Sequence, residues 1–101
     1  MKTLIDKFNR VLENRVRLGI MSLLAVTDAM DFNTMKRHLD VTDGNLATHV
    51  AVLESNRYVR VRKEFVGRKP QTTYEITPTG RQAFASHINA LEQFIRESRK
   101  E

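Results

Sequence analysis

The strongest constraint on the fold is a pair of helical patterns separated by only two residues. The first pattern runs over residues 33–39, the second over residues 43–55 with its cap at residue 42, and residues 40–41 connect them. Asn33 and Thr42 have side chains that cap helix N-termini, and each stands at the start of its pattern. Two helices joined by so tight a turn have the outline of a helix-turn-helix motif.

The hydrophobic period changes from helical to alternating directly after the second of these helices. Apolar and polar side chains alternate over residues 59–65, and the alternation resumes over residues 72–76. Between them, residues 66–70 include a glycine and a proline, which favour a turn. These patterns predict a two-stranded β-hairpin at about residues 59–76.

Helical patterns also flank the motif and the hairpin. On the N-terminal side they cover about residues 3–12 and then residues 14–26, where an asparagine is the expected cap, and residues 27–31 are interpreted as a loop. On the C-terminal side, Thr77 is the expected cap of a helix over about residues 78–97 that starts with a proline. The order of elements predicts a mostly helical α+β fold.

The length and composition are those of a chain that folds around one core. It has 101 residues, 41% of them apolar, with no internal repeat or low-complexity tract. We therefore expect residues 1–101 to form a single domain.

Positive charge is concentrated in the predicted hairpin. The chain carries a net charge of +5, and residues 57–69 alone contain six basic residues against one acidic residue, Glu64. The segment therefore carries a charge equal to that of the whole chain. A concentrated basic segment indicates a polyanionic partner.

The sequence also indicates the cellular compartment of the protein. The absence of cysteine fits a reducing intracellular setting. The longest apolar stretch, residues 18–26, is shorter than the roughly 20 residues that a membrane span needs. The N-terminus lacks the pattern of a signal peptide. We expect a cytoplasmic protein without a membrane partner.

No motif for catalysis is present. The histidines lack metal-ligand spacing, the glycines form no phosphate-binding loop, and no serine lies in a nucleophile motif. We therefore expect no enzyme activity, no catalytic residue, no metal and no cofactor.

Several segments together resemble one family. The segment from Thr42 to His49 is followed by Leu53 and Glu54, and Tyr58 and Val59 open the hairpin. Further matches are Arg17, Leu18 and Ile20 in the helix before the motif, and Thr73, Tyr74, Ile76, Thr77, Pro78, Gly80 and Arg81 at the exit from the hairpin. Over roughly residues 15–90 the chain resembles the small winged-helix transcriptional regulators related to the MarR and ArsR groups. The resemblance implies a winged helix-turn-helix fold, DNA binding, regulation of transcription and a homodimer built from terminal helices. The metal-binding cysteines of many ArsR sensors are missing, so metal sensing is not implied.

The second helix of the motif, residues 43–55, is the candidate recognition helix. If Leu46, Val50 and Leu53 face the core, the outward face carries the residues that would meet DNA in the major groove. These candidates are Thr42, Gly44, Asn45, Thr48 and His49. Amide and hydroxyl groups bond to base edges or phosphates, and an imidazole N–H can reach a phosphate. Taken alone, the same face is equally well read as a capped, solvated surface.

The hairpin favours the DNA interpretation. Its candidate contacts to the DNA backbone or the minor groove are Arg60, Arg62, Lys63, Arg68 and Lys69. The alternative is a solvated edge strand protected from aggregation by its charges. A different class of function, a winged-helix module that binds protein or RNA, also stays open.

Two terminal apolar stripes are candidates for a dimer contact. They comprise Leu4, Ile5, Phe8, Phe84, Ile88, Leu91 and Ile95. Since twofold symmetry is the commonest oligomeric arrangement, we expect a homodimer. The alternative is that both stripes pack on their own chain.

Overall fold

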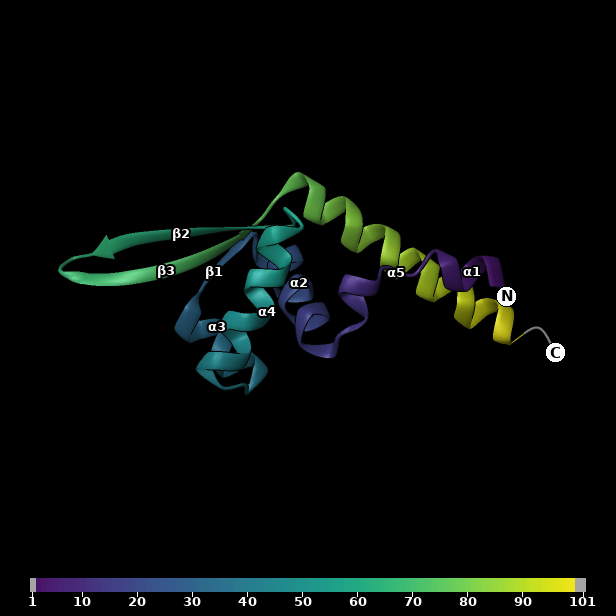
Figure 1. Cartoon of the computed structure of the whole chain (residues 1–101), viewed down its shortest axis with the longest axis horizontal. Coiled ribbons are helices and arrows are strands. Elements are labelled where there is room, and N and C mark those ends of the chain that lie inside the picture. The colour runs from purple at the N-terminus through teal and green to yellow at the C-terminus, as the bar shows by residue number, and fades with distance from the viewer. Residues whose placement is uncertain (1, 100–101) are drawn as a thin grey trace.

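The computed structural model describes residues 2–99, so residues 1, 100 and 101 of the predicted domain lie outside the described residues. Figure 1 shows the elements in chain order: α1 (Lys2–Asp6), the 3-10 helix η1 (Arg10–Glu13), α2 (Arg15–Thr27), β1 (Ala29–Asp31), α3 (Phe32–Leu39), α4 (Asp43–Ser55), β2 (Val59–Val66), β3 (Lys69–Ile76) and α5 (Pro78–Ser98). The predicted α+β class, with mostly helical elements, is confirmed.

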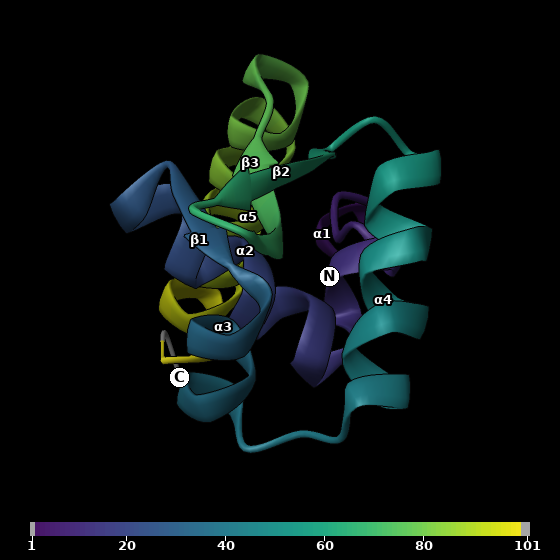
Figure 2. The ribbon, with the colours of Figure 1, turned by 90° about the vertical axis from the view of Figure 1, so that its left-hand side faces the viewer.

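The molecule is elongated, with principal extents of 59 × 25 × 21 Å. The β2–β3 hairpin, which we call the wing, projects at one end of the long axis (Figure 1). The C-terminal half of α5 and α1 lie at the opposite end. Figure 2 looks at the wing end and shows α4 on one flank and α3 with β1 on the other. Across residues 2–99 no helix is long and apolar enough to cross a membrane.

One hydrophobic core holds the helix-turn-helix and the base of the wing together. Its fully buried side chains come from η1, α2, α3 and α4: Leu12, Ile20, Met21, Leu24, Met35, Leu46 and Leu53. Val59, Tyr74 and Ile76 bring the base of the wing into the same cluster. The predicted inward stripe of α4 is confirmed, so the opposite face of that helix is turned outward.

Three of the four predicted helix caps are confirmed and one is wrong. Asn14, Thr42 and Thr77 each accept backbone N–H bonds at the start of α2, α4 and α5. The cap of α3 is Asp31 and not Asn33, which lies within the helix. The Asp31 carboxylate accepts from the Thr34 N–H at 3.1 Å and from its hydroxyl at 2.6 Å. A carboxylate outcompetes an amide here because it also receives that hydroxyl and interacts favourably with the helix dipole.

The interpretation of residues 27–31 as a loop is wrong in part. Ala29–Asp31 form β1, which pairs antiparallel with β3 through Met30 and Tyr74. The sheet therefore has three strands in the order β1-β3-β2, where the sequence predicted a two-stranded hairpin. A strand of three residues is too short for an alternating pattern to reveal.

The predicted helix over residues 3–12 is also wrong, because it is broken in the middle. α1 ends at Asp6, and Asn9 takes an extended conformation before η1. Asn9 makes three hydrogen bonds there: its Oδ1 accepts from the Val11 N–H at 2.9 Å, its Nδ2 donates to the Tyr58 hydroxyl at 3.0 Å, and its N–H donates to His87 Nδ1 at 3.0 Å. Two of these partners are distant in sequence, so the apolar spacing alone suggested one continuous helix.

Candidate nucleic-acid interface

The outward face of α4 is a row of polar and small side chains. Thr42, Gly44, Asn45 and Thr48 are exposed, and the Thr42 hydroxyl accepts the Asn45 N–H at 3.1 Å. A Cβ built on Gly44 meets no heavy atom within 4 Å, so packing in this chain does not require glycine there. The helix presents a small-residue N-terminal turn with backbone N–H groups directed outward.

His49 differs from its neighbours because it is half-buried and has a partner. Arg17 Nη1 lies 3.0 Å from His49 Nδ1, and Arg17 Nε donates to the Val11 carbonyl oxygen at 2.7 Å. A guanidinium only donates hydrogen bonds, so Nδ1 of His49 accepts and the ring N–H is on Nε2. Arg17 thus fixes the tautomer of a candidate DNA contact. Sequence reasoning missed this role because the two residues are 32 positions apart.

The wing is a regular two-stranded ribbon that closes in a tight turn. Its register runs from Val59↔Ile76 to Val66↔Lys69, which leaves Gly67 and Arg68 as the turn. Gly67 has φ of 66° while Arg68 has no positive φ, the pattern of a type II′ turn with glycine at its first central position. The tip is therefore narrower than residues 66–70, the tip predicted from the sequence.

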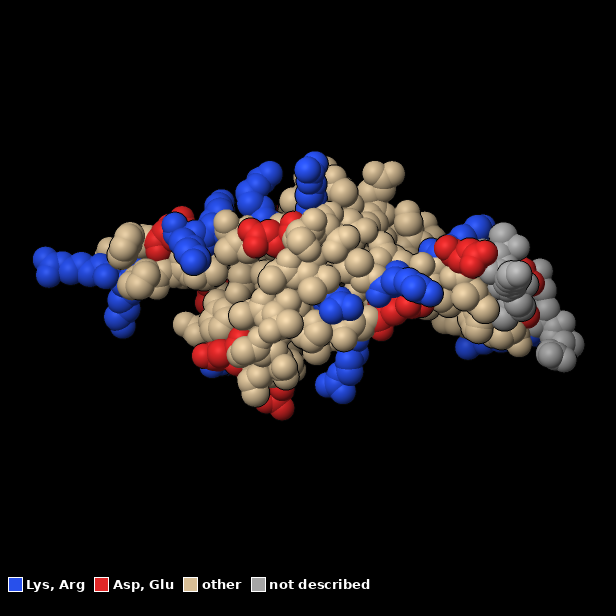
Figure 3. All heavy atoms as spheres, in the orientation of Figure 1, with Lys and Arg blue, Asp and Glu red and all other residues tan. Residues whose placement is uncertain are grey.

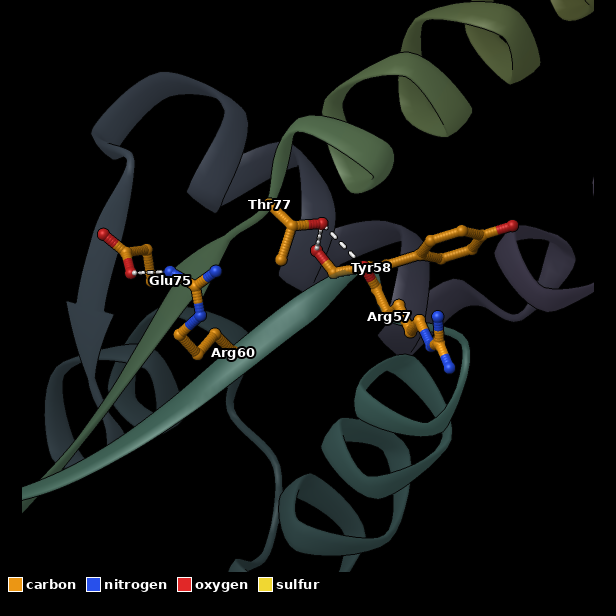
Figure 4. A network of polar contacts seen from close by, with 5 residues as sticks. All are labelled: Arg57, Tyr58, Arg60, Glu75 and Thr77. Atoms are coloured by element: carbon orange, nitrogen blue, oxygen red, sulfur yellow. Dashed lines mark hydrogen bonds and ion pairs between the residues drawn. The ribbon is translucent and has the colours of Figure 1, made fainter.

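One face of the wing is turned toward α4 and the other is turned away from it. Val61 and Lys63 of β2 face α4 across a groove of about 690 Å³, whose other lining residues are Phe32, Ala47, Val50, Ala51, Glu54, Thr72 and Tyr74. Arg60 and Arg62 alternate with them and lie on the opposite face, where Arg60 pairs with Glu75 at 3.2 Å (Figure 4). Among the predicted wing contacts, Lys63 faces α4, Arg60 and Arg62 face away, and Arg68 and Lys69 are at the tip. Figure 3 shows basic side chains projecting from this end.

A polar joint fixes the wing to the end of α4 and the start of α5 (Figure 4). The Thr77 hydroxyl lies 2.6 Å from the carbonyl oxygen of Arg57 and 3.1 Å from that of Tyr58. The backbone approach is so close that a Cβ on Gly80 would lie 2.2 Å from the Tyr58 carbonyl oxygen. Arg57 adopts φ of 64°, which reverses the chain between α4 and β2. The joint sets the angle between the candidate recognition helix and the wing.

The terminal stripes predicted for a dimer divide into buried and exposed parts. Leu4 is 7% exposed within its own chain, and Phe8 packs edge-on against Phe94 with ring centroids 5.7 Å apart. Ile5 and Ile95 are 54% and 49% exposed, respectively. The remaining members, Phe84, Ile88 and Leu91, are half-buried.

α5 packs on its own chain through a face that the sequence did not indicate. Its buried residues are Gly80, His87 and Ala90. His87 Nδ1 accepts the Asn9 N–H, and burial lowers the pKa of the imidazole. His87 thus belongs to a structural contact, and within residues 2–99 no cluster of three or more histidine, aspartate or glutamate side chains is arranged to hold a metal.

Residues 16–95 match the family described as winged helix DNA-binding domain. The chain belongs to this family. The winged-helix domain is 33% identical over 84 residues to an uncharacterised protein of Methanocaldococcus jannaschii, covering 83% of this chain and 91% of that protein. Among solved structures, it is similar to the transcriptional regulator homologue protein of Pyrococcus horikoshii OT3, with a TM-score of 0.90 and 33% identity over 98% of this chain and 99% of that one. It also resembles the fold of reduced AbfR bound to DNA, with a TM-score of 0.73 and 17% identity over 87% and 64% of the two chains.

These matches confirm the winged-helix fold and the resemblance to MarR-type regulators. The family is described as a DNA-binding domain and the Pyrococcus horikoshii structure as a transcriptional regulator homologue, in agreement with the prediction that the chain is not an enzyme. In this winged-helix domain, the face of α4 and the wing are therefore the surfaces to consider for DNA.

Proposed function

We propose that this winged-helix domain binds double-stranded DNA sequence-specifically as a small transcriptional regulator, with α4 in the major groove and the wing on the adjacent backbone or minor groove. The observation that carries the proposal is the position of a polar, outward α4 face beside a projecting basic ribbon. An α-helix has the width that the major groove admits.

The face of α4 supplies groups suited to reading bases. The Asn45 amide can pair with the edge of adenine, and the Thr48 hydroxyl and methyl can contact a base edge or a thymine methyl. The absence of a side chain on Gly44 lets the first turn approach the duplex closely. The Thr42 hydroxyl caps the Asn45 N–H, and the N–H groups that precede it in this turn can bond a phosphate oxygen.

The wing supplies charge for the backbone. Arg68 and Lys69 at the tip and Lys63 on the face toward α4 are exposed, and within residues 2–99 none of the three forms an ion pair. Arg60 contributes less, because its guanidinium already pairs with Glu75. The tip cations are thus the main anchors, while Arg60 and Arg62 serve phosphates on the outer side of the wing.

We also propose that two copies assemble through the terminal helices. α1 and the C-terminal half of α5, which contain the exposed Ile5 and Ile95, lie at the end of the long axis opposite the wing. A twofold contact there covers these side chains and leaves both α4 helices free. Such a dimer reads two half-sites about 34 Å apart. Light scattering should give twice the chain mass of 11.7 kDa, and a monomer at micromolar concentration contradicts this part.

The test of DNA binding starts with selection of bound sites from random duplexes, followed by affinity measurements on the selected site at several salt concentrations. Affinity should fall steeply with salt, and Arg68→Ala should reduce the slope of log K against log salt by about one unit. Arg99→Ala, at the opposite end of the molecule, is the matched control and should leave the slope unchanged. Thr48→Ala should change which sites are selected. A slope near zero for the wild type refutes DNA binding.

A further inference from the structure

We infer that Phe65 is an apolar wedge that the wing inserts into the minor groove, so that the domain bends the DNA it binds. This inference rests on the proposed function. Phe65 is 74% exposed and its neighbour Val66 is 60% exposed. Phe65 pairs with the exposed Pro70 across the ribbon, and an exposed apolar patch on a projecting element indicates contact with a partner.

The fold explains why nothing in the chain covers Phe65. Of the β2 residues on the face toward α4, Val59 is in the core and Val61 lines the groove. The ribbon then extends beyond the body of the molecule (Figure 1), so the last positions of this face have no helix against them. The apolar character of Phe65 is therefore not required for packing.

The position of Phe65 directs it toward the duplex. Strand alternation places it on the same face as Lys63, which lines the groove facing α4. DNA engaged by α4 lies on this side of the wing. In the register of the hairpin, Phe65 is opposite Pro70, which adds a second apolar ring to the same face. Val66 lies on the other face and provides an internal control.

The positive charge around Phe65 is complementary to the phosphates of a nucleic acid. Arg62, Lys63, Arg68 and Lys69 surround it in the sequence, and Glu64 is the one acidic residue among them. These cations draw the tip to phosphates, and the type II′ turn keeps the tip narrow. Proteins that bind the minor groove combine basic side chains with apolar wedges that unstack a base step and kink the duplex.

A second copy of the chain is not the partner that this tip fits. The helices proposed for dimer contact, α1 and the C-terminal half of α5, lie at the opposite end of the 59 Å long axis (Figure 1). Assembly through that end leaves both wing tips free. The tip also carries the same sign of charge in each copy, so two tips repel.

The first experiment uses the absence of tryptophan from the chain. Phe65→Trp and Val66→Trp each introduce a single tryptophan, on opposite faces of the same tip. With saturating selected duplex, the emission of Phe65→Trp should be quenched and its accessibility to acrylamide should fall, because the indole stacks on bases. Val66→Trp should change little. Equal responses of the two variants, or no response of Phe65→Trp while the duplex is bound, overturn the inference.

The second experiment measures the bend. Energy transfer between dyes at the two ends of the selected duplex should rise on binding of the wild type. Phe65→Ala should abolish most of this rise and weaken binding about tenfold, whereas Phe65→Leu should keep most of both. The salt slope should be the same for all three, because no cation is removed. An unchanged bend in Phe65→Ala contradicts the wedge.

The two proposals fail in different ways. Electrophoretic mobility shifts report binding independently of the tip fluorophore and of the bend. If no duplex is shifted at low salt, DNA binding itself fails and the wedge fails with it. If the duplex is shifted but both tip experiments are negative, only the wedge fails and DNA binding stands.

Discussion

Gly80→Ala tests the claim that the joint between α4, the wing and α5 depends on close backbone contact. The new Cβ would lie 2.2 Å from the Tyr58 carbonyl oxygen and 2.9 Å from its carbonyl carbon. Favourable contact distances are about 3.5 Å, so the start of α5 must move away from β2 by about 1 Å. Both atoms belong to backbone, so no side-chain rotation relieves the clash.

The magnitude follows from three contributions. Overpacking costs about 1–3 kcal/mol, and loss of the hydrogen bond from the Thr77 N–H to the Tyr58 carbonyl, now 3.1 Å, costs about 1 kcal/mol. The higher helix propensity of alanine offsets up to about 1 kcal/mol. The net loss in the free energy of unfolding is about 2 kcal/mol, equivalent to a Tm lower by about 10 °C for a domain of this size.

Urea unfolding followed by circular dichroism measures this loss, at one protein concentration because the proposed dimerisation would make stability concentration-dependent. Gly44→Ala is the matched control, since a Cβ there meets no atom within 4 Å. It should leave stability unchanged or raise it by up to about 1 kcal/mol. The reasoning is refuted if Gly80→Ala is as stable as the wild type, or if both variants shift stability in the same direction.

Three further predictions concern single contacts. Asp31→Ala should lower the free energy of unfolding by about 1 kcal/mol at neutral pH. The hydrogen bond from the Thr34 hydroxyl lowers the Asp31 pKa, so this stabilisation is present above the unfolded pKa of about 3.9 and is lost as the pH falls through the lower folded value. Urea unfolding across this pH range should show the loss. Burial lowers the His87 pKa, so the unfolded chain binds more protons than the folded one just below about pH 6.5. The free energy of unfolding should therefore decrease as the pH is lowered through this range. In urea titrations, His87→Asn should remove this part of the pH dependence. If Arg17 acts by orienting His49, Arg17→Gln should weaken DNA binding about two- to tenfold and leave the slope of log K against log salt unchanged. A slope smaller by about one unit would instead show that Arg17 contacts a phosphate.

The sequence predicted those parts of the fold that rest on local chemistry. The spacing of Leu46, Val50 and Leu53 and the caps Thr42 and Thr77 depend on near neighbours, so the pattern was sufficient to place α4 and α5. The wing followed from its alternation and its turn residues.

The errors occurred where distant residues decide the conformation. Asn9 breaks the first helix through bonds to Tyr58 and His87, and β1 exists because β3 is available to pair with Met30. For the candidate site, the sequence predicted the outward residues of α4 but not the hydrogen bond from Arg17 that orients His49. No window of neighbouring residues contains these contacts.

The same long-range contacts connect the proposed dimer end of the molecule with its proposed DNA-reading end. Asn9 bonds to His87 on α5 and to Tyr58 at the base of the wing, and Thr77 joins the start of α5 to both Arg57 and Tyr58. A shift of α5 relative to the N-terminal segment therefore changes hydrogen bonds at the point where the wing leaves α4. Since the proposed recognition needs α4 and the wing at a fixed angle, we expect changes in the packing of α5 to affect the proposed DNA reading as well as the proposed assembly.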